Sequence, residues 1–194
     1  MAYRLVLVVL VTISTLGASG CSASLFKVKP VTELPPMSIT AKSSDAGGVT
    51  VRVNPLLTDE EAQELFEANL PLSGVLPVRL ELGFESGLPV ETRKARFHLR
   101  DEEGREWKLL SPKQAISRIL KANEVFAYNP NSRKQFEKEF SAYALDLKTP
   151  LSSAEPRRQG FLFFLSPDKR PVGSLQKLTL TIERMPQAAS IALN

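Results

Sequence analysis

The chain has 194 residues, of which 43% are hydrophobic and 24% charged, so it can form a core of ordinary size. Its formal net charge of +4 is too small to indicate nucleic acid as a partner. One histidine and one cysteine do not supply the usual zinc ligand sets, and glycine-rich phosphate loops are absent from the sequence. We therefore expect no metal ion or other cofactor.

Residues 1–20 have the pattern of a secretory signal peptide. Arg4 is the only charged residue before an apolar run from Leu5 to Leu16, and small residues follow that run. The apolar run is about a dozen residues long, whereas a helix needs roughly 20 residues to cross a bilayer. The pattern therefore predicts a removable signal rather than a permanent membrane span.

The four residues Ala18, Ser19, Gly20 and Cys21 resemble the lipobox of bacterial lipoproteins, with Ala18 where that family prefers Leu. The same small residues also fit ordinary signal cleavage, which would leave Cys21 as a free thiol. We expect lipidation, because Cys21 has no second cysteine with which to form a disulfide. The resemblance implies cleavage before Cys21, fatty acylation such as palmitate there and, with Ser22 next, an outer-membrane anchor facing the periplasm.

Residues 21–36 are expected to form a lipidated tether, because Pro30, Pro35 and Pro36 stand among few apolar residues. One folded domain is expected over residues 37–186. Residues 187–194 are expected to form a C-terminal tail.

Strands are predicted where apolar and polar residues alternate with period two. The alternating segments are 49–54, 78–84, 94–100, 107–109 and 177–183. The turn at 101–104 joins two of them into a hairpin over residues 92–110. Residues 161–165 are apolar throughout, which predicts a strand covered on both faces, and a further strand is expected around Ile39. The alternation places Leu80, Phe97, Trp107 and Phe163 in the core.

Three short helices are predicted from capping boxes, in which a hydroxyl accepts a hydrogen bond from the third residue along the helix. The boxes start at Thr58, Ser111 and Ser132, and apolar residues at helical spacing follow each one. Pro112 stands at the first position of the second helix, where its missing N–H costs nothing.

These elements predict a mainly β domain, an immunoglobulin-like antiparallel β-sandwich with about three short inserted helices. The segments 74–78, 85–90 and 160–164 resemble those of immunoglobulin-like domains in bacterial envelope lipoproteins, over about residues 58–183. The resemblance implies a fold and brings no activity with it.

Catalytic residues are scarce in the sequence. His98 is predicted on the solvated face of a strand, and the Ser-x-x-Lys matches at Ser166 and Ser174 lie in a turn and before a strand rather than at the start of a helix. The acids Glu60, Glu61, Glu64 and Glu67 follow a helix N-terminus, where the helix dipole favours negative charge. We interpret the Arg157/Arg158 pair as solvated surface and expect no enzyme.

Two functions remain open. The favoured one is a membrane-anchored envelope lipoprotein that acts as a non-enzymatic protein-binding or scaffolding module, bound to the membrane through lipid on Cys21. The alternative is an envelope hydrolase or a carrier of lipid or another small ligand. A deep polar pocket would favour the alternative, whereas a filled core with exposed aromatic residues near Phe126 and Tyr128 would favour the module.

Overall fold

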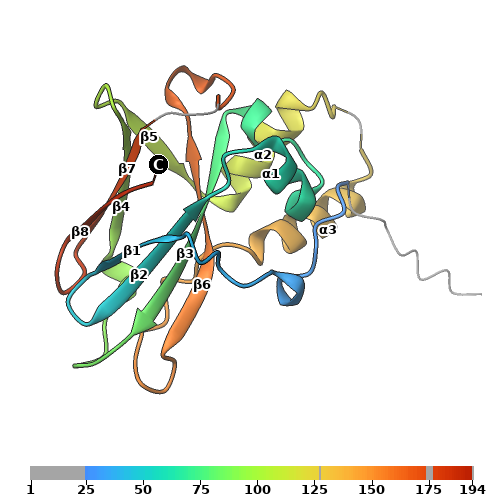
Figure 1. Ribbon diagram of the computed structural model, residues 1–194. Helices are drawn as coiled ribbons and strands as arrows, with labels where there is room; N and C mark the ends of the chain where they lie inside the picture. The colour runs from blue at the N-terminus through green and yellow to red at the C-terminus, as the bar shows by residue number, and fades with distance from the viewer. Residues whose placement is uncertain (1–24, 127, 174–176, 194) are drawn as a thin grey trace, which may run out of the picture.

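The computed structural model describes residues 25–126, 128–173 and 177–193. This part of the chain forms an antiparallel sheet with three α-helices on one side of it (Figure 1). The prediction of a mainly β fold with three helices is confirmed. The strands are β1 (Lys42–Asp45), β2 (Val49–Pro55), β3 (Val75–Phe84), β4 (Arg96–Asp101), β5 (Glu106–Leu110), β6 (Arg157–Leu165), β7 (Leu178–Glu183) and β8 (Ala189–Ala192). The helices are α1 (Asp59–Phe66), α2 (Pro112–Ala122) and α3 (Pro130–Ser141), with short 3-10 turns η1 (Val31–Glu33), η2 (Pro71–Ser73), η3 (Thr92–Lys94) and η4 (Pro167–Lys169).

The eight strands follow the order β1-β2-β3-β6-β5-β4-β7-β8, and each neighbouring pair is antiparallel. The two edge strands, β1 and β8, lie close to one another. Ala46 directly follows β1 and Gln187 lies just before β8, and the Gln187 N–H donates a hydrogen bond to the Ala46 carbonyl over 3.2 Å. The sheet is therefore nearly closed.

The inside of this sheet is filled by the apolar residues of the alternating strands. Leu80, Phe97 and Trp107 are all buried there, as the alternation predicts. Their neighbours in this inner core include Val49, Val51, Val53, Leu76, Val78, Leu82, Leu99, Leu162, Phe164, Leu178, Leu180, Ile182 and Ile191.

A second core lies between the helices and the outer faces of β3 and β6. Phe163 on β6 is buried there, also as predicted, and its ring stacks on Phe140 of α3 with 4.6 Å between centroids. Phe66, at the end of α1, contacts both of these rings. The strand over residues 161–165 is apolar throughout because the inner core covers one of its faces and the helices cover the other.

Two of the three predicted capping boxes are confirmed, at Thr58 and Ser111. The third is wrong: α3 begins at Pro130, and its N-cap is Asn129, whose side chain accepts from the Asn131 N–H over 2.8 Å. Asn is as good an N-cap as Ser, and Pro at the first helical position is already held near helical φ. The helix therefore starts before Ser132.

The chain ends differ from the sequence-based boundaries. Sequence analysis places a tether at residues 21–36, whereas the described part of it packs on the domain: Val28 is buried, and Phe26 lies 5.1 Å from the ring of Phe136. Ile39 is 98% exposed and the nearby strand begins only at Lys42. At the other end, residues 189–192 form β8, in the segment expected to be a tail.

The predicted hairpin over residues 92–110 is present as β4 and β5, and Asp101 organises its turn. The Asp101 carboxylate accepts hydrogen bonds from the Glu103 N–H and from the N–H and Nε of Arg105, over 2.9 to 3.1 Å. Burial alone would raise the pKa of Asp101, but these hydrogen bonds and the charge of Arg105 outweigh it, so the pKa lies below its usual value.

We expect Asp101→Asn to lower the free energy of unfolding by about 1–3 kcal/mol at pH 7, because charge-assisted hydrogen bonds are lost. A carboxylate with a lowered pKa in the folded state stabilises the fold above its unfolded pKa of about 4, and this contribution is lost as the pH falls through the folded pKa. Urea unfolding from pH 7 to pH 2.5 should therefore show the difference between variant and wild type shrinking. A difference that stays constant would contradict this account, and Glu102→Gln, on an exposed side chain, is the control.

Candidate functional site

The helices leave part of the outer face of β2, β3 and β6 uncovered, and that part is polar. Outward-facing residues on these strands form three cross-strand rows, because the register aligns them. The rows are Asn54–Arg79–Phe161, Arg52–Glu81–Gln159 and Thr50–Gly83–Arg157. Three arginines, one from each strand, therefore share one face of the sheet.

Residues 34–38, which we call the strap, cross this face. The Arg79 Nη2 donates to the Pro35 carbonyl over 2.7 Å, and the Arg52 Nη2 donates to the Ser38 carbonyl over 3.0 Å. Two arginines of the sheet thus hold the backbone of the strap, and the side chain of Met37, a residue of the strap, is buried.

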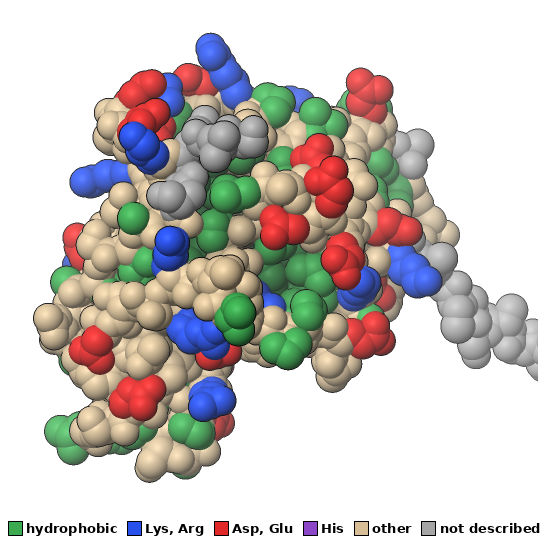
Figure 2. All heavy atoms as spheres, viewed as in Figure 1, with side chains coloured by type: hydrophobic (Ala, Val, Ile, Leu, Met, Phe, Trp, Pro, Cys, Tyr) green, Lys and Arg blue, Asp and Glu red, His purple; other side chains and the backbone are tan. Residues whose placement is uncertain are grey.

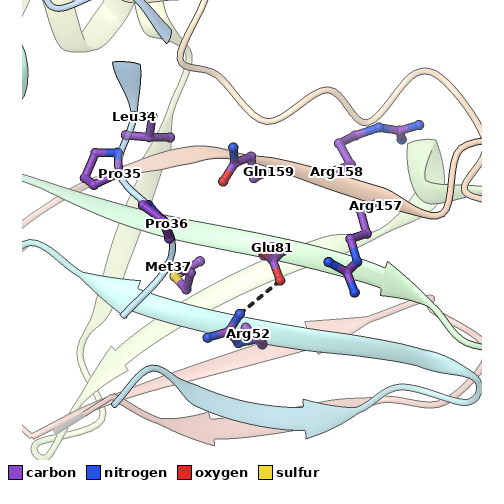
Figure 3. Close-up of a pocket in the computed structure, with 9 residues that line it drawn as sticks. All are labelled: Leu34, Pro35, Pro36, Met37, Arg52, Glu81, Arg157, Arg158 and Gln159. Carbon is purple, nitrogen blue, oxygen red and sulfur yellow. Dashed lines mark hydrogen bonds and ion pairs between the residues drawn. The ribbon is translucent and has the colours of Figure 1, made fainter. Parts of the chain in front are cut away.

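On one side of the strap lies a groove of about 520 Å³, which we call the arginine groove (Figure 3). The strap forms its apolar wall with Leu34, Pro35, Pro36 and Met37. Its polar wall consists of Arg52, Glu81, Arg157, Arg158 and Gln159.

On the other side of the strap lies a smaller cavity of about 190 Å³, which we call the Arg79 pocket. Pro35 and Pro36 line both spaces, so only the strap separates them. Arg79 and Asn54 supply polar groups to the Arg79 pocket, and Leu56, Leu65 and Phe161 supply apolar surface. Glu61 and Glu64 of α1 complete its lining.

The charges of this face are unequally paired. Arg52 forms an ion pair with Glu81 over 3.1 Å. Arg157 is exposed, and its side chain points toward Glu81 and Arg52 in Figure 3, but within the described residues it forms no hydrogen bond or ion pair. Arg157 therefore adds a positive charge to this face that is not paired with a carboxylate in the described part of the chain.

Arg79 is only 5% exposed, and within the described ranges no carboxylate forms an ion pair with it. Its Nη2 donates to two neutral oxygens, the Pro35 carbonyl and the Gln159 side chain, each over 2.7 Å, while its Nε has no partner. Burial lowers the pKa of the Arg79 guanidinium, and the Glu81 carboxylate opposes this effect. A buried cation without a counter-charge is costly, so this arrangement needs an explanation.

Arg158 has a different role from its neighbour Arg157. Its guanidinium donates to the carbonyls of Asp146, Thr149 and Pro150 and pairs with Glu155 over 3.0 Å. Although Arg158 lines the arginine groove, its guanidinium is directed away from Arg52 and Glu81 in Figure 3 and holds the loop before β6. The interpretation of this pair as solvated surface is therefore wrong for Arg158.

The candidate catalytic residues of the sequence are not brought together. His98 lies on β4 with its Nδ1 2.8 Å from Glu106, and the hydrogen bond with His98 lowers the pKa of Glu106. The Ser166 hydroxyl donates to the Arg170 carbonyl beside η4. Cys21 and Ser174 lie outside the described residues.

Three of the four acidic residues at the first helix, Glu61, Glu64 and Glu67, interact with other groups of the protein. Glu61 completes the capping box, Glu64 pairs with Lys29 over 2.9 Å, and Glu67 accepts a hydrogen bond from the Lys27 N–H. Figure 2 shows acidic side chains gathered over α1. This acidic surface borders the Arg79 pocket on its α1 side.

No group of three or more His, Cys, Asp or Glu side chains in the described part of the chain is arranged to hold a metal ion. Over the same ranges, none of the helices has both the length and the apolar character needed to cross a bilayer.

Sequence reasoning did not identify Arg52, Arg79 or the strap as parts of a site. The available signal was that Arg52 and Arg79 occupy outward positions of alternating strands, but that pattern is typical of any solvated strand face.

Comparison with protein-family models, with curated proteins and with solved structures found no match to this chain.

Proposed function

We propose that the chain is a membrane-anchored envelope lipoprotein that acts as a non-enzymatic protein-binding module, with the face around the strap as its partner-binding surface. The observation that carries this proposal is that neither Arg79 nor Arg157 forms an ion pair within the described residues, although both lie beside the apolar residues of the strap. Arginine is enriched at protein interfaces, because its planar guanidinium binds carboxylates while its stem packs on apolar groups.

The alternative functions have less support in the described residues. A carrier of lipid needs an internal cavity, whereas apolar side chains including Trp107 fill the nearly closed sheet. A hydrolase needs a nucleophile beside a base, whereas Ser166 bonds to Arg170 and His98 bonds to Glu106. Phe126 is 78% exposed, so its ring is available for contacts with a partner protein, as the binding module requires.

The immunoglobulin-like sandwich is part of this proposal. The four strands β1-β2-β3-β6 and the four strands β5-β4-β7-β8 bury their inner side chains in one shared core. Strand β5 is joined to β6 by three residue pairs, from Lys108↔Leu165 to Leu110↔Phe163, and to β4 by two, Leu99↔Trp107 and Arg100↔Glu106. Two packed halves connected through one strand with such short pairing are compatible with a two-sheet sandwich.

The anchor proposal predicts the behaviour of a Cys21→Ala variant. Two or more acyl chains hold a protein stably on a bilayer, whereas without them no membrane attachment is expected. We expect wild type in the membrane fraction and nearly all of the variant in the soluble fraction, with acyl mass on the wild-type N-terminal peptide. An unmodified Cys21 thiol in membrane-free wild type would reject the anchor.

The proposed anchor would hold the domain close to the membrane. Leu25 and Phe26 already pack against the helices, so only four residue steps separate Cys21 from the folded part, about 14 Å at full extension. Figure 1 shows the described N-terminal end on the helical side of the molecule. The helices would thus lie nearest the lipid and the far strand ends of the sheet would lie away from it.

The partner-binding surface is tested by photocrosslinking in intact cells. A photoreactive phenylalanine analogue at position 157, in the arginine groove, should give a discrete adduct with a partner protein. The same analogue at Lys108, which is exposed on β5, is the matched control and should give none. Equal adducts at both positions, or none at position 157, would argue against this surface.

A further inference from the structure

We infer that the Arg79 pocket binds the C-terminal residue of a peptide chain, with the terminal carboxylate on Arg79 and an aliphatic side chain on the apolar floor. The inference rests on the proposed function for the choice of a protein ligand. It adds the chemical group that is recognised and the residues that recognise it.

The unused donors of Arg79 are the first part of the argument. The guanidinium carries five N–H groups, and both of its hydrogen bonds in the described structure are made by Nη2. Nη1 has no hydrogen-bond partner within the described residues, whereas Nε is fully buried, and the side chain lines the pocket. A carboxylate oxygen that accepts from Nη1 would form a charge-assisted hydrogen bond and neutralise the guanidinium.

Asn54 provides a second polar group at the same place. It stands directly opposite Arg79 on the neighbouring strand and lines the same pocket. Within the described residues its side-chain amide has no hydrogen-bond partner, so it is available to donate to a ligand oxygen. A guanidinium and an amide on one side of a cavity are suited to one carboxylate.

The remaining lining selects the rest of the ligand. Leu56, Leu65 and Phe161 form an apolar floor that suits an aliphatic side chain. The volume of about 190 Å³ is smaller than the roughly 300–1,000 Å³ of pockets for drug-sized ligands, so it admits about one residue. Glu61 and Glu64 at the α1 side disfavour a second negative charge, which argues for a ligand with a single carboxylate.

Calorimetry with the whole chain in a nonionic detergent tests this inference. The probe is the tripeptide acetyl-Ala-Ala-Leu with a free carboxylate, and the controls are its C-terminal amide and isovalerate, a small aliphatic acid. We expect saturable binding of the free acid and at least tenfold weaker binding of both controls. Equal binding of the amide would overturn the role of the carboxylate, and equal binding of isovalerate would overturn the choice of a peptide.

Variants locate the site within the protein. Asn54→Asp places a carboxylate opposite Arg79, so it should occupy the guanidinium, leave the melting temperature unchanged or higher, and weaken tripeptide binding at least tenfold. Arg79→Gln should weaken binding by the same factor. Lys108→Gln removes an exposed cation on β5, outside the pocket and the arginine groove, and should change binding less than twofold.

Wild-type affinity in a folded Asn54→Asp variant would overturn the site, and so would loss of binding in Lys108→Gln. Failure of this inference is distinguishable from failure of the proposed function. A partner that crosslinks at position 157 while the tripeptide does not bind refutes only the carboxylate pocket. Tripeptide binding without any crosslinked partner refutes the binding module and leaves the pocket.

Discussion

Phe66→Ala is expected to lower the free energy of unfolding by about 3–5 kcal/mol, the range for truncating a buried phenylalanine. The Phe66 side chain is fully buried, and its ring lies 5.0 to 6.2 Å from four others. These belong to Phe140 of α3, to Tyr143 just after that helix, and to Phe161 and Phe163 on β6. Its removal leaves a cavity where the helices meet the sheet, and each lost aromatic pair adds to the cost.

Urea unfolding followed by tryptophan fluorescence measures this effect, since Trp107 reports on the other core. Phe126→Ala is the matched control, because Phe126 is exposed and its loss should change stability by less than about 0.5 kcal/mol. A loss below about 1 kcal/mol for Phe66→Ala would mean that the helices do not pack on β6 as described.

Gly160→Ala is expected to cost about 3 kcal/mol or more, although it adds a single methyl group. A Cβ at Gly160 would lie 2.5 Å from the Leu145 Cα and 2.7 Å from the Leu145 nitrogen, and backbone atoms cannot rotate away as a side-chain end can. The segment after α3 is also bonded to β6, with the Phe161 N–H donating to Tyr143 over 2.7 Å and the Leu145 N–H donating to Phe161 over 3.1 Å. Overpacking and the weakening of both hydrogen bonds act together.

The expected signature of Gly160→Ala is a lower melting temperature with faster amide exchange at Leu145 and Phe161. Gly173→Ala is the control, because no atom of the described residues lies within 4 Å of a Cβ there, and it should be neutral within about 0.5 kcal/mol. If the two variants melted at the same temperature, the close approach of residues 144–145 to β6 would be disproved.

The strands can be predicted from the sequence because the alternation of apolar and polar residues is a local property of the chain. On β2 and β7, a buried and a more exposed residue follow one another along the whole strand, as the apolar pattern predicts. The Thr58 and Ser111 boxes were accessible for the same reason, since a cap is decided within four residues. The error at Ser132 arose because Asn129 and Pro130 compete for the same role three residues earlier.

The candidate site cannot be predicted from the sequence, because it depends on pairing between strands that are distant along the chain. Arg79 stands opposite Asn54 on one side and Phe161 on the other, and no local pattern specifies that register. Residues 34–36 of the strap fall within the predicted tether, because prolines are typical of linkers. The strap is ordered by contacts that the sequence does not reveal, among them the hydrogen bond from Arg79 to Pro35.

The sequence by itself determined the mainly β composition, most strand positions, two helix starts and the residues of the inner core. Each of these follows from side-chain polarity or hydrogen bonding within a few residues along the chain. Tertiary structure alone decided that the sheet nearly closes, that residues 34–38 cross its outer face, and that Arg79 is buried without an ion pair to any carboxylate of the described residues. These features arise from contacts between segments far apart in the sequence, as in the hydrogen bonds from Arg79 to Gln159 and from Gln187 to Ala46. Strand order and register set such contacts, and alternation fixes only which face a residue occupies, never which residue it meets there.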